Sequence, residues 1–319
     1  MTGAPPGGRR LPVDVGVPDR RGSYRCSDAS RLRDEPLTAT ASTVRAFLLL
    51  EEPGPWGPAV LRCHRVPDGV RDQARAWERD LGLRPLLVRR PERSGRVSGE
   101  PRRVFVVNAR HGWAQTALVD SLDEVASWDL SGVLGAGGVG LEPHAGPLLL
   151  VCTHGRHDAC CAERGRPVAT ALAARWPEEV WESSHLGGDR FAPNLLVLPG
   201  GHAYGRLDPP DAVEVVARHL AGKITLDRHR GRTVVPWVAQ AAEAAVRARF
   251  GETGVDAVSS RVLRRDAAGA DVVVRVRGQA VSVRVDVDAD APARLSCTAP
   301  RPVAAPAYRI SVASWHDGQ

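Results

Sequence analysis

Residues 147–176 read PLLLVCTHGRHDACCAERGRPVATALAARW, and this stretch sets the fold class of the chain. Its first six residues (147–152) form an apolar run, which is typical of a buried strand, and residues 166–176 have the apolar spacing of a helix. The pattern then continues with a strand and loop (179–188), a hairpin (194–207) and a closing helix (210–222). This order, β-α-β-β-β-α over about 75 residues, predicts an α/β fold with helices packed on a small thioredoxin-like sheet.

The chain upstream of this stretch has a similar order of elements. The pattern predicts an apolar strand (47–50), a helix that stops at a glycine (68–82), two strands in PLLVRRP (85–91) and RVFVVNAR (103–110), and a short helix (121–130). Ser121 and Glu124 predict a capping box at the start of that short helix. The glycine-rich segment 131–146 predicts a linker.

The chain downstream predicts a helix and several strands. Residues 236–251 have helical spacing, residues 270–290 alternate apolar and polar around a glycine-containing turn, and YRISVASW (308–315) is typical of a strand. The sequence as a whole therefore predicts four parts: a flexible tail (1–22), an N-terminal α/β domain (23–146) for which a thioredoxin-like fold is also a candidate, a thioredoxin-like domain (147–225), and a smaller α+β extension (226–319).

The composition excludes several classes of protein. With 319 residues, of which 43% are hydrophobic, the chain has enough apolar material for two or three compact units. No run approaches the roughly 20 apolar residues of a membrane span, and residues 1–21 lack the apolar core of a secretory signal. The net charge of +6 is spread along the chain and only 5% of residues are aromatic. We therefore expect a cytoplasmic protein that binds neither membrane nor nucleic acid.

Cysteine and histidine residues surround the end of the strand at 147–152. Cys152 ends the strand and Cys161 begins the following helix, so both thiols should lie at one rim of the sheet, where a helix N-terminus favours thiolate. Farther along, SSHLGGDRFAPN (183–194) presents His185 and Asp189 around a double glycine, whose backbone can approach another group closely. Thiolates on one segment and an imidazole on another are suitable ligands for iron or zinc.

The residues alone leave other interpretations open. The C-x8-C spacing of Cys152 and Cys161 is a weak signal, and the neighbouring Cys160 equally fits a small residue that faces the core. His154 and His157 are further candidate ligands, and the spacing allows a zinc site built from Cys152, His157 and Cys161. The adjacent cysteine pair lacks the C-x-x-C spacing of a thiol-exchange site.

The other three cysteines carry weaker signals. Cys26 lies in RCSDAS (25–30), which predicts a turn or a helix N-cap. Cys63 and Cys297 are isolated in the sequence, and we expect them to have structural roles.

Three linked motifs resemble those of the sucrase/ferredoxin-like proteins: LLLVCTHGRHDACCAERGRPVATAL (148–172), HLGGDRFAPNLLVLP (185–199) and FLLLEEPGPWG (47–57). The resemblance covers roughly residues 24–222 and implies a thioredoxin-like 2Fe-2S ferredoxin core. It does not imply sugar hydrolysis, because the motifs supply cysteine and histidine instead of the carboxylate pair that glycosidases use.

The resemblance also implies a set of ligands. Characterised eukaryotic members of the family hold their cluster with two cysteines of a C-x8-C segment and two histidines of an H-x-G-G-H segment. Transferred to this sequence, these positions are Cys152, Cys161 and His185, and Asp189 stands where the second histidine would be. Asp158 keeps the acidic position of the first segment.

The aspartate at the fourth position is the main departure from the family pattern. A carboxylate is harder and more negative than imidazole, so it should lower the reduction potential of a cluster. We expect Asp189 to be the fourth ligand; the alternatives are that Cys160 or His202 replaces it, or that no cluster is bound.

These residues predict an electron carrier that holds a 2Fe-2S cluster through cysteine, histidine and aspartate. A protonatable His185 would couple uptake of one electron to uptake of a proton. The chain contains no flavin or nicotinamide loop, so we expect it to exchange electrons with a redox partner protein that the sequence does not identify, and not to act as a standalone enzyme. The alternatives are a cluster-free thioredoxin-fold binding or scaffold protein, and a protein with a structural zinc site.

Overall fold

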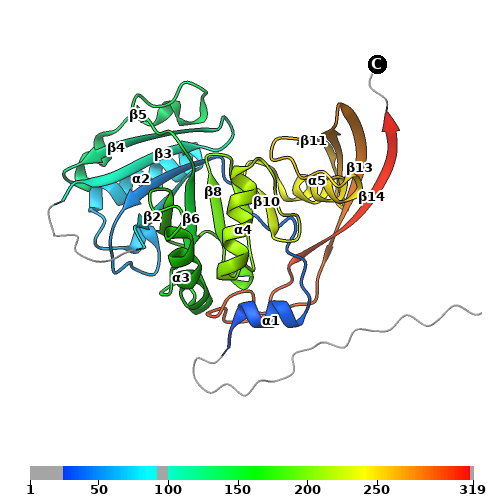
Figure 1. Ribbon diagram of the computed structural model, residues 1–319, viewed down its shortest axis with the longest axis horizontal. Coiled ribbons are helices and arrows are strands. Elements are labelled where there is room, and N and C mark those ends of the chain that lie inside the picture. Colours follow the sequence, from blue (N-terminus) through cyan, green and yellow to red (C-terminus); the bar gives the residue numbers. More distant parts are fainter. Residues whose placement is uncertain (1–23, 92–99, 317–319) are drawn as a thin grey trace, which may run out of the picture.

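The computed structural model describes residues 24–91 and 100–316, so the predicted tail at 1–22 lies outside the described residues. The protein has a mixed α/β fold with a ten-stranded sheet and a separate four-stranded antiparallel sheet (Figure 1). Among the described residues, no helix has both the length and the apolar character that crossing a membrane requires.

The ten-stranded sheet is built from two consecutive parts of the chain. The first part contributes β1 (Ala46–Glu51), η1 (Val60–Arg62), α2 (Asp68–Leu81), β2 (Leu83–Arg89), β3 (Arg102–Asn108), β4 (Trp113–Val119), η2 (Leu122–Ser127), η3 (Ser131–Leu134) and β5 (Glu142–Pro143). The second part contributes β6 (Leu148–Cys152), α3 (Ala159–Ala173), β7 (Val180–Ser183), η4 (Asp189–Phe191), β8 (Leu195–Leu198), β9 (His202–Tyr204), α4 (Pro209–Leu220) and β10 (His229–Arg232). The strand order is β10-β9-β8-β6-β7-β2-β1-β3-β4-β5.

The same arrangement of strands occurs in both parts. In the first, β1 is parallel to β2 and antiparallel to β3, and β3 is antiparallel to β4. In the second, β6 is parallel to β7 and antiparallel to β8, and β8 is antiparallel to β9. The two parts join where β2 and β7 pair antiparallel through Val88↔Ser183 and Arg89↔Glu182. The predicted boundary at 146/147 thus divides a continuous sheet, and the predicted domain division stays a prediction.

Local signals explain where the two main crossover helices begin and end. Helix α2 ends as predicted, at Gly82, which has φ 63°, a left-handed conformation that glycine adopts without steric cost. Helix α3 begins at Ala159, just before Cys161, which the sequence predicted to begin it, because the Asp158 side chain caps it by accepting a hydrogen bond from the Cys160 backbone N–H. This start places Cys161 in the first turn of the helix.

Alternate side chains of the strands face two different cores. Leu49 and Leu150 belong to a cluster on one face that is continuous across both halves of the sheet. On the opposite face, Leu48 packs with residues of α2, whereas Leu149 packs with residues of α3 and α4. Helices α2, α3 and α4 therefore cover one face of the sheet. On the opposite face, the two halves of the sheet form one common core.

The second sheet has the order β11-β12-β13-β14, and α5 packs against it (Figure 1). Its elements are α5 (Trp237–Phe250), β11 (Val258–Arg265), β12 (Gly269–Val276), β13 (Gln279–Ala289) and β14 (Pro306–His316). The predicted hairpin at 270–290 is confirmed as β12 and β13. The sequence did not predict β4, β5, β10 or β11. The segment 131–146, predicted as a linker, contains η3 and the strand β5, which pairs with β4. A short helix, α1 (Cys26–Leu32), precedes the sheets.

Candidate metal centre

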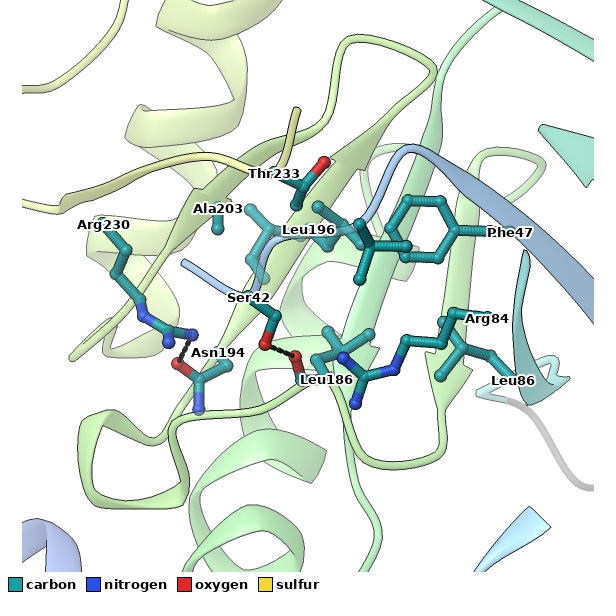
Figure 2. A pocket seen from close by; sticks show the side chains of 12 residues that line it. Ser42, Phe47, Arg84, Leu86, Leu186, Asn194, Leu196, Ala203, Arg230 and Thr233 are labelled. Carbon is teal, nitrogen blue, oxygen red and sulfur yellow. Dashed lines mark hydrogen bonds between the residues drawn. The ribbon is translucent and has the colours of Figure 1, made fainter. Parts of the chain in front are cut away.

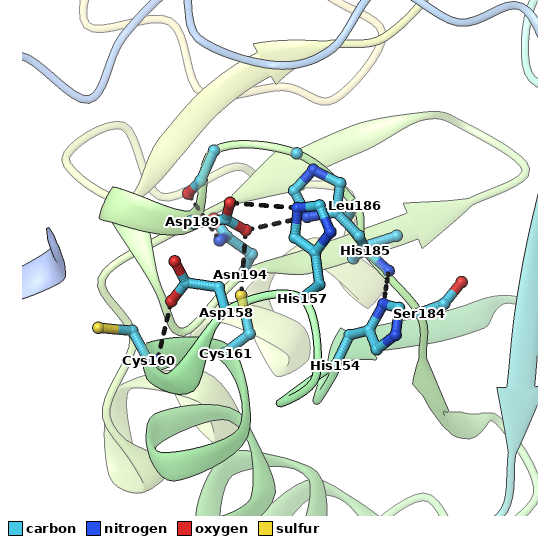
Figure 3. A network of polar contacts seen from close by, with 12 residues as sticks. His154, His157, Asp158, Cys160, Cys161, Ser184, His185, Leu186, Asp189 and Asn194 are labelled. Carbon is cyan, nitrogen blue, oxygen red and sulfur yellow. Dashed lines mark hydrogen bonds and ion pairs between the residues drawn. The ribbon is translucent and has the colours of Figure 1, made fainter. Parts of the chain in front are cut away.

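The four predicted ligands meet at one rim of the ten-stranded sheet. Figure 3 shows three of them, Cys161, His185 and Asp189. Cys152 is the last residue of β6, Cys161 lies in the first turn of α3, and His185 and Asp189 lie in the connection from β7 to β8. The Cys152 sulfur contacts both the Cys161 thiol and the His185 ring. Two chain segments that are distant in the sequence thus supply one compact group of sulfur, nitrogen and oxygen atoms.

The Asp189 carboxylate lies at the centre of this group. Its Oδ1 atom is 3.3 Å from the Cys161 sulfur and 2.9 Å from Nδ1 of His185. Its Oδ2 atom is 3.5 Å from Nε2 of His157, and the rings of His157 and His185 stack with their centroids 3.8 Å apart. His157 therefore lies with the four predicted ligands. From the sequence it was only a further candidate ligand, like His154.

Burial and mutual contacts shift the protonation of these groups. Hydrogen bonding from the Cys161 thiol, together with the nearby His185 ring, lowers the pKa of Cys152, although burial opposes this. The contact with Cys152 and burial raise the pKa of Cys161. Burial opposes the charge on both His185 and Asp189, but the carboxylate and the Cys152 sulfur raise the pKa of His185 to about 9, and the two histidines lower the pKa of Asp189. The site therefore favours a thiolate and a carboxylate next to an imidazolium.

The nitrogen of His185 that faces this group lacks a well-aligned hydrogen bond. Nδ1 is buried and close to Asp189, but the contact does not have the alignment of a hydrogen bond. The backbone N–H of His185 donates to Nδ1 of His154 at 3.2 Å, and Nε2 of His154 lies 2.7 Å from the carbonyl oxygen of Gly57. His154 therefore connects the loop that bears His185 to the EPGPWG segment (52–57) of the first half.

The double glycine allows this loop to pack closely on its neighbours. Gly187 and Gly188 have φ values of 92° and 77°, and a Cβ on either would lie 2.2 Å from Ser42 Oγ or from a guanidinium nitrogen of Arg230, respectively. Arg230 is buried and donates to the carbonyl oxygen of Gly187 at 2.9 Å and to Oδ1 of Asn194 at 2.8 Å. Figure 2 shows this contact between Arg230 and Asn194. Arg230 could not be recognised from the sequence, because it lies in an ordinary run of basic residues.

Two alternative fourth ligands lie elsewhere. The sulfur of Cys160 lies on the other side of the first turn of α3 from the sulfur of Cys161 (Figure 3), within 3.8 Å of Cys26 and 3.3 Å of Cys297. His202 belongs to a separate group on β9, where its Nδ1 lies 3.1 Å from Nε2 of His229. Neither side chain is placed with Cys152 and Cys161 in the described structure.

Comparison with known proteins agrees with the motifs. A family model described as sucrase/ferredoxin-like matches residues 37–231. The chain belongs to the sucrase/ferredoxin-like family. No curated protein and no solved structure matches the sequence.

The sucrase/ferredoxin-like segment covers the ten-stranded sheet from β1 to all but the last residue of β10, and it includes all four predicted ligands. It also includes Arg230, which contacts the loop of His185 directly, and Gly57, which contacts that loop through His154. The second sheet and α5 lie outside the segment. The candidate site is therefore built entirely from the part of the chain that matches the family model.

The donor set fits an iron–sulfur cluster or another metal site. Cys152 and Cys161 provide two buried sulfurs, and the His185 imidazole and the Asp189 carboxylate lie beside them. Thiolates select soft or borderline metals, and imidazole and carboxylate ligands are also used by iron and zinc. The buried nitrogen of His185 without an aligned hydrogen bond agrees with a ligand role for that ring.

Proposed function

We propose that this protein carries single electrons by means of a 2Fe-2S cluster held by Cys152, Cys161, His185 and Asp189. The observation that carries the proposal is the Asp189 carboxylate, which lies within 3.3 Å of the Cys161 sulfur and 2.9 Å of the His185 ring. The strand order of the second half, with β6 parallel to β7 and antiparallel to β8, supports a thioredoxin-like core for this cluster.

A bound 2Fe-2S cluster would supply one-electron chemistry, and the protein side chains would control its charge and access. The His185 side chain is 25% exposed, so its ring can exchange a proton with solvent. Asp189 is almost completely buried and adds a negative charge close to the centre. His157 contacts this carboxylate and orients it. The redox partner is a protein, and the six free cysteines agree with a reducing compartment such as the cytoplasm.

Removal of either cysteine should abolish the cluster. We expect the protein, purified without oxygen, to be red-brown with iron and sulfide in equal amounts, and we expect Cys152→Ser or Cys161→Ser to be colourless. Cys63→Ser is the matched control, because Cys63 is equally buried but lies in a different core. The measurements are visible absorption and analysis of iron, sulfide and zinc. A colourless wild-type protein that also fails to take up iron and sulfide would rule out the proposal.

The aspartate ligand has its own test, because replacing it should change the potential without removing the cluster. We expect Asp189→His, which creates the family's histidine pair, to raise the reduction potential by on the order of 100 mV, since a neutral ligand replaces an anionic one. The measurement is a redox titration followed by visible absorption. Asp72→His, at an exposed carboxylate in α2, is the control and should leave the potential unchanged. An unchanged potential in Asp189→His would show that Asp189 does not bind the iron.

A second candidate function is a mononuclear metal site without sulfide. His157, His185 and Asp189 offer three ligand atoms within 4.8 Å of one another, and two histidines with one carboxylate form a known metal-binding set. In this case the metal would be lost in His157→Asn, whereas a cluster held by Cys152, Cys161, His185 and Asp189 would remain. Stoichiometric zinc or iron without sulfide would identify this alternative.

A further inference from the structure

Three cysteines that are far apart in the sequence meet on the other side of α3. Cys26 begins α1, Cys160 lies in the first turn of α3, and Cys297 lies in the connection from β13 to β14. Their sulfur–sulfur distances are 3.8 Å (Cys26 to Cys160), 3.3 Å (Cys160 to Cys297) and 3.6 Å (Cys297 to Cys26). Cys297 is therefore not isolated in space, and the sulfur of Cys26, besides lying at the start of α1, contacts the sulfurs of Cys160 and Cys297.

A carboxylate completes this group. Oδ2 of Asp158 lies 3.5 Å from the Cys26 sulfur. The backbone N–H groups of Cys160 and Cys297 donate to its two oxygens at 2.9 and 2.6 Å, so the carboxylate is held in place while each oxygen keeps a free lone pair. Four possible ligand atoms thus lie within 4.8 Å of one another.

The spacing fits a single tetrahedral metal ion. Sulfur ligands about 2.3 Å from Zn²⁺ lie about 3.8 Å apart in a tetrahedron, and a carboxylate oxygen lies about 3.5 Å from each sulfur. The three sulfur–sulfur distances of 3.3 to 3.8 Å and the sulfur–oxygen distance of 3.5 Å are within about 0.5 Å of these values. They are much longer than the S–S bond of about 2.05 Å in a disulfide.

We propose that Cys26, Cys160, Cys297 and Asp158 bind one Zn²⁺ ion, at a site separate from the centre of Cys152 and Cys161. Three thiolates and one carboxylate favour zinc among the divalent metals and leave no open position for a substrate, which is typical of a structural site. Cys26 and Cys160 are fully buried, whereas Cys297 is partly exposed and gives the ion a path of entry.

The ion would join three parts of the fold that are distant in the sequence. The connection between β13 and β14 passes beside α1 (Figure 1), where Arg294 accepts a hydrogen bond on its carbonyl oxygen from the Tyr24 hydroxyl at 2.7 Å. Cys297 belongs to this connection, which lies outside the segment matched by the family model, and Cys160 belongs to that segment. The site would therefore fasten the C-terminal sheet and α1 to the first turn of α3.

The proposal is tested by zinc analysis of full-length variants. The Cys152→Ser/Cys161→Ser variant, which lacks the other centre's sulfurs, should keep about one zinc per chain. Cys26→Ser/Cys297→Ser should hold less than about a tenth of that amount after purification with reductant and zinc, while it keeps any iron and sulfide. Cys63→Ser is the control for loss of a buried thiol and should keep its zinc.

A second measurement does not depend on folding of a variant. The zinc X-ray absorption of the wild-type protein should show three sulfur ligands at about 2.3 Å and one oxygen ligand. Wild-type protein that takes up no zinc, zinc that remains in Cys26→Ser/Cys297→Ser, or a disulfide among these cysteines under reducing conditions would overturn the proposal. None of these results depends on whether iron is bound at Cys152 and Cys161.

Discussion

Gly165→Ala should lower the free energy of unfolding by about 3 kcal/mol and prevent the metal binding that we propose for Cys152 and Cys161. Gly165 lies where α3 crosses the end of β6, and a Cβ at this position would be 2.1 Å from the carbonyl oxygen of Cys152. This atom belongs to the backbone of a central strand, so the helix must move away from the sheet. Because α3 carries Cys161, the same movement separates the two sulfurs.

The control is Gly69→Ala, another glycine-to-alanine change within a helix. A Cβ at Gly69 would have only ordinary contact, 3.7 Å from the Cβ of Ala126. Alanine favours a helix by up to about 1 kcal/mol over glycine, so this variant should be as stable as the wild type or more stable. Denaturant unfolding and iron analysis of both variants provide the comparison. Equal stabilities of the two variants would contradict the close packing of α3 on β6.

Arg89→Leu should lower the free energy of unfolding by about 3 to 5 kcal/mol. The Arg89 guanidinium lies 2.5 Å from Oε2 of Glu182, and both side chains are buried at the pairing of β2 with β7. Removal of the cation leaves the Glu182 carboxylate buried, with the Thr153 hydroxyl at 3.0 Å as a donor. The guanidinium also lies 4.2 Å from the centre of the Trp56 ring, and this contact would be lost as well.

A double substitution separates the charge from the packing. We expect Arg89→Leu/Glu182→Leu to recover at least about half of the lost stability, because no buried charge remains. Arg79→Leu, which breaks the exposed pair between Arg79 and Asp80, should change the stability by less than about 1 kcal/mol. All three are measured by denaturant unfolding at equal metal content. A double variant less stable than Arg89→Leu would show that the ion pair is not the main contribution.

The order of elements could be predicted from the sequence, because it depends on local patterns. The apolar run at 147–152, the glycine that ends α2 and the alternation at 270–290 all correspond to observed elements. The pairing of β2 with β7 could not be predicted in this way. Arg89 and Glu182 are 93 residues apart, and the sequence of neither strand indicates which strand it pairs with. The short strand β10 was missed because HRGR has no apolar alternation.

The candidate site was predictable only where a motif contained it. Cys152, Cys161, His185 and Asp189 lie in two motifs, and the structure brings them together. The group of Cys26, Cys160 and Cys297 was not predictable, because it joins segments separated by up to 271 residues and has no spacing that a motif could record. Proximity of that kind depends on how the connection between β13 and β14 folds back, which only the structure shows.

The pairing of β2 with β7 also limits how this family architecture can be divided. Each of these two strands would be an open edge if its partner were removed, and an apolar edge strand invites association with other chains. His154 adds a second dependence, since the loop that bears His185 is held from the first half through the carbonyl of Gly57. The half that carries Cys152, Cys161, His185 and Asp189 is therefore not expected to work as an independent unit. Without the first half it would keep these four residues but lose both the β2 strand and the Gly57 contact that hold them in place.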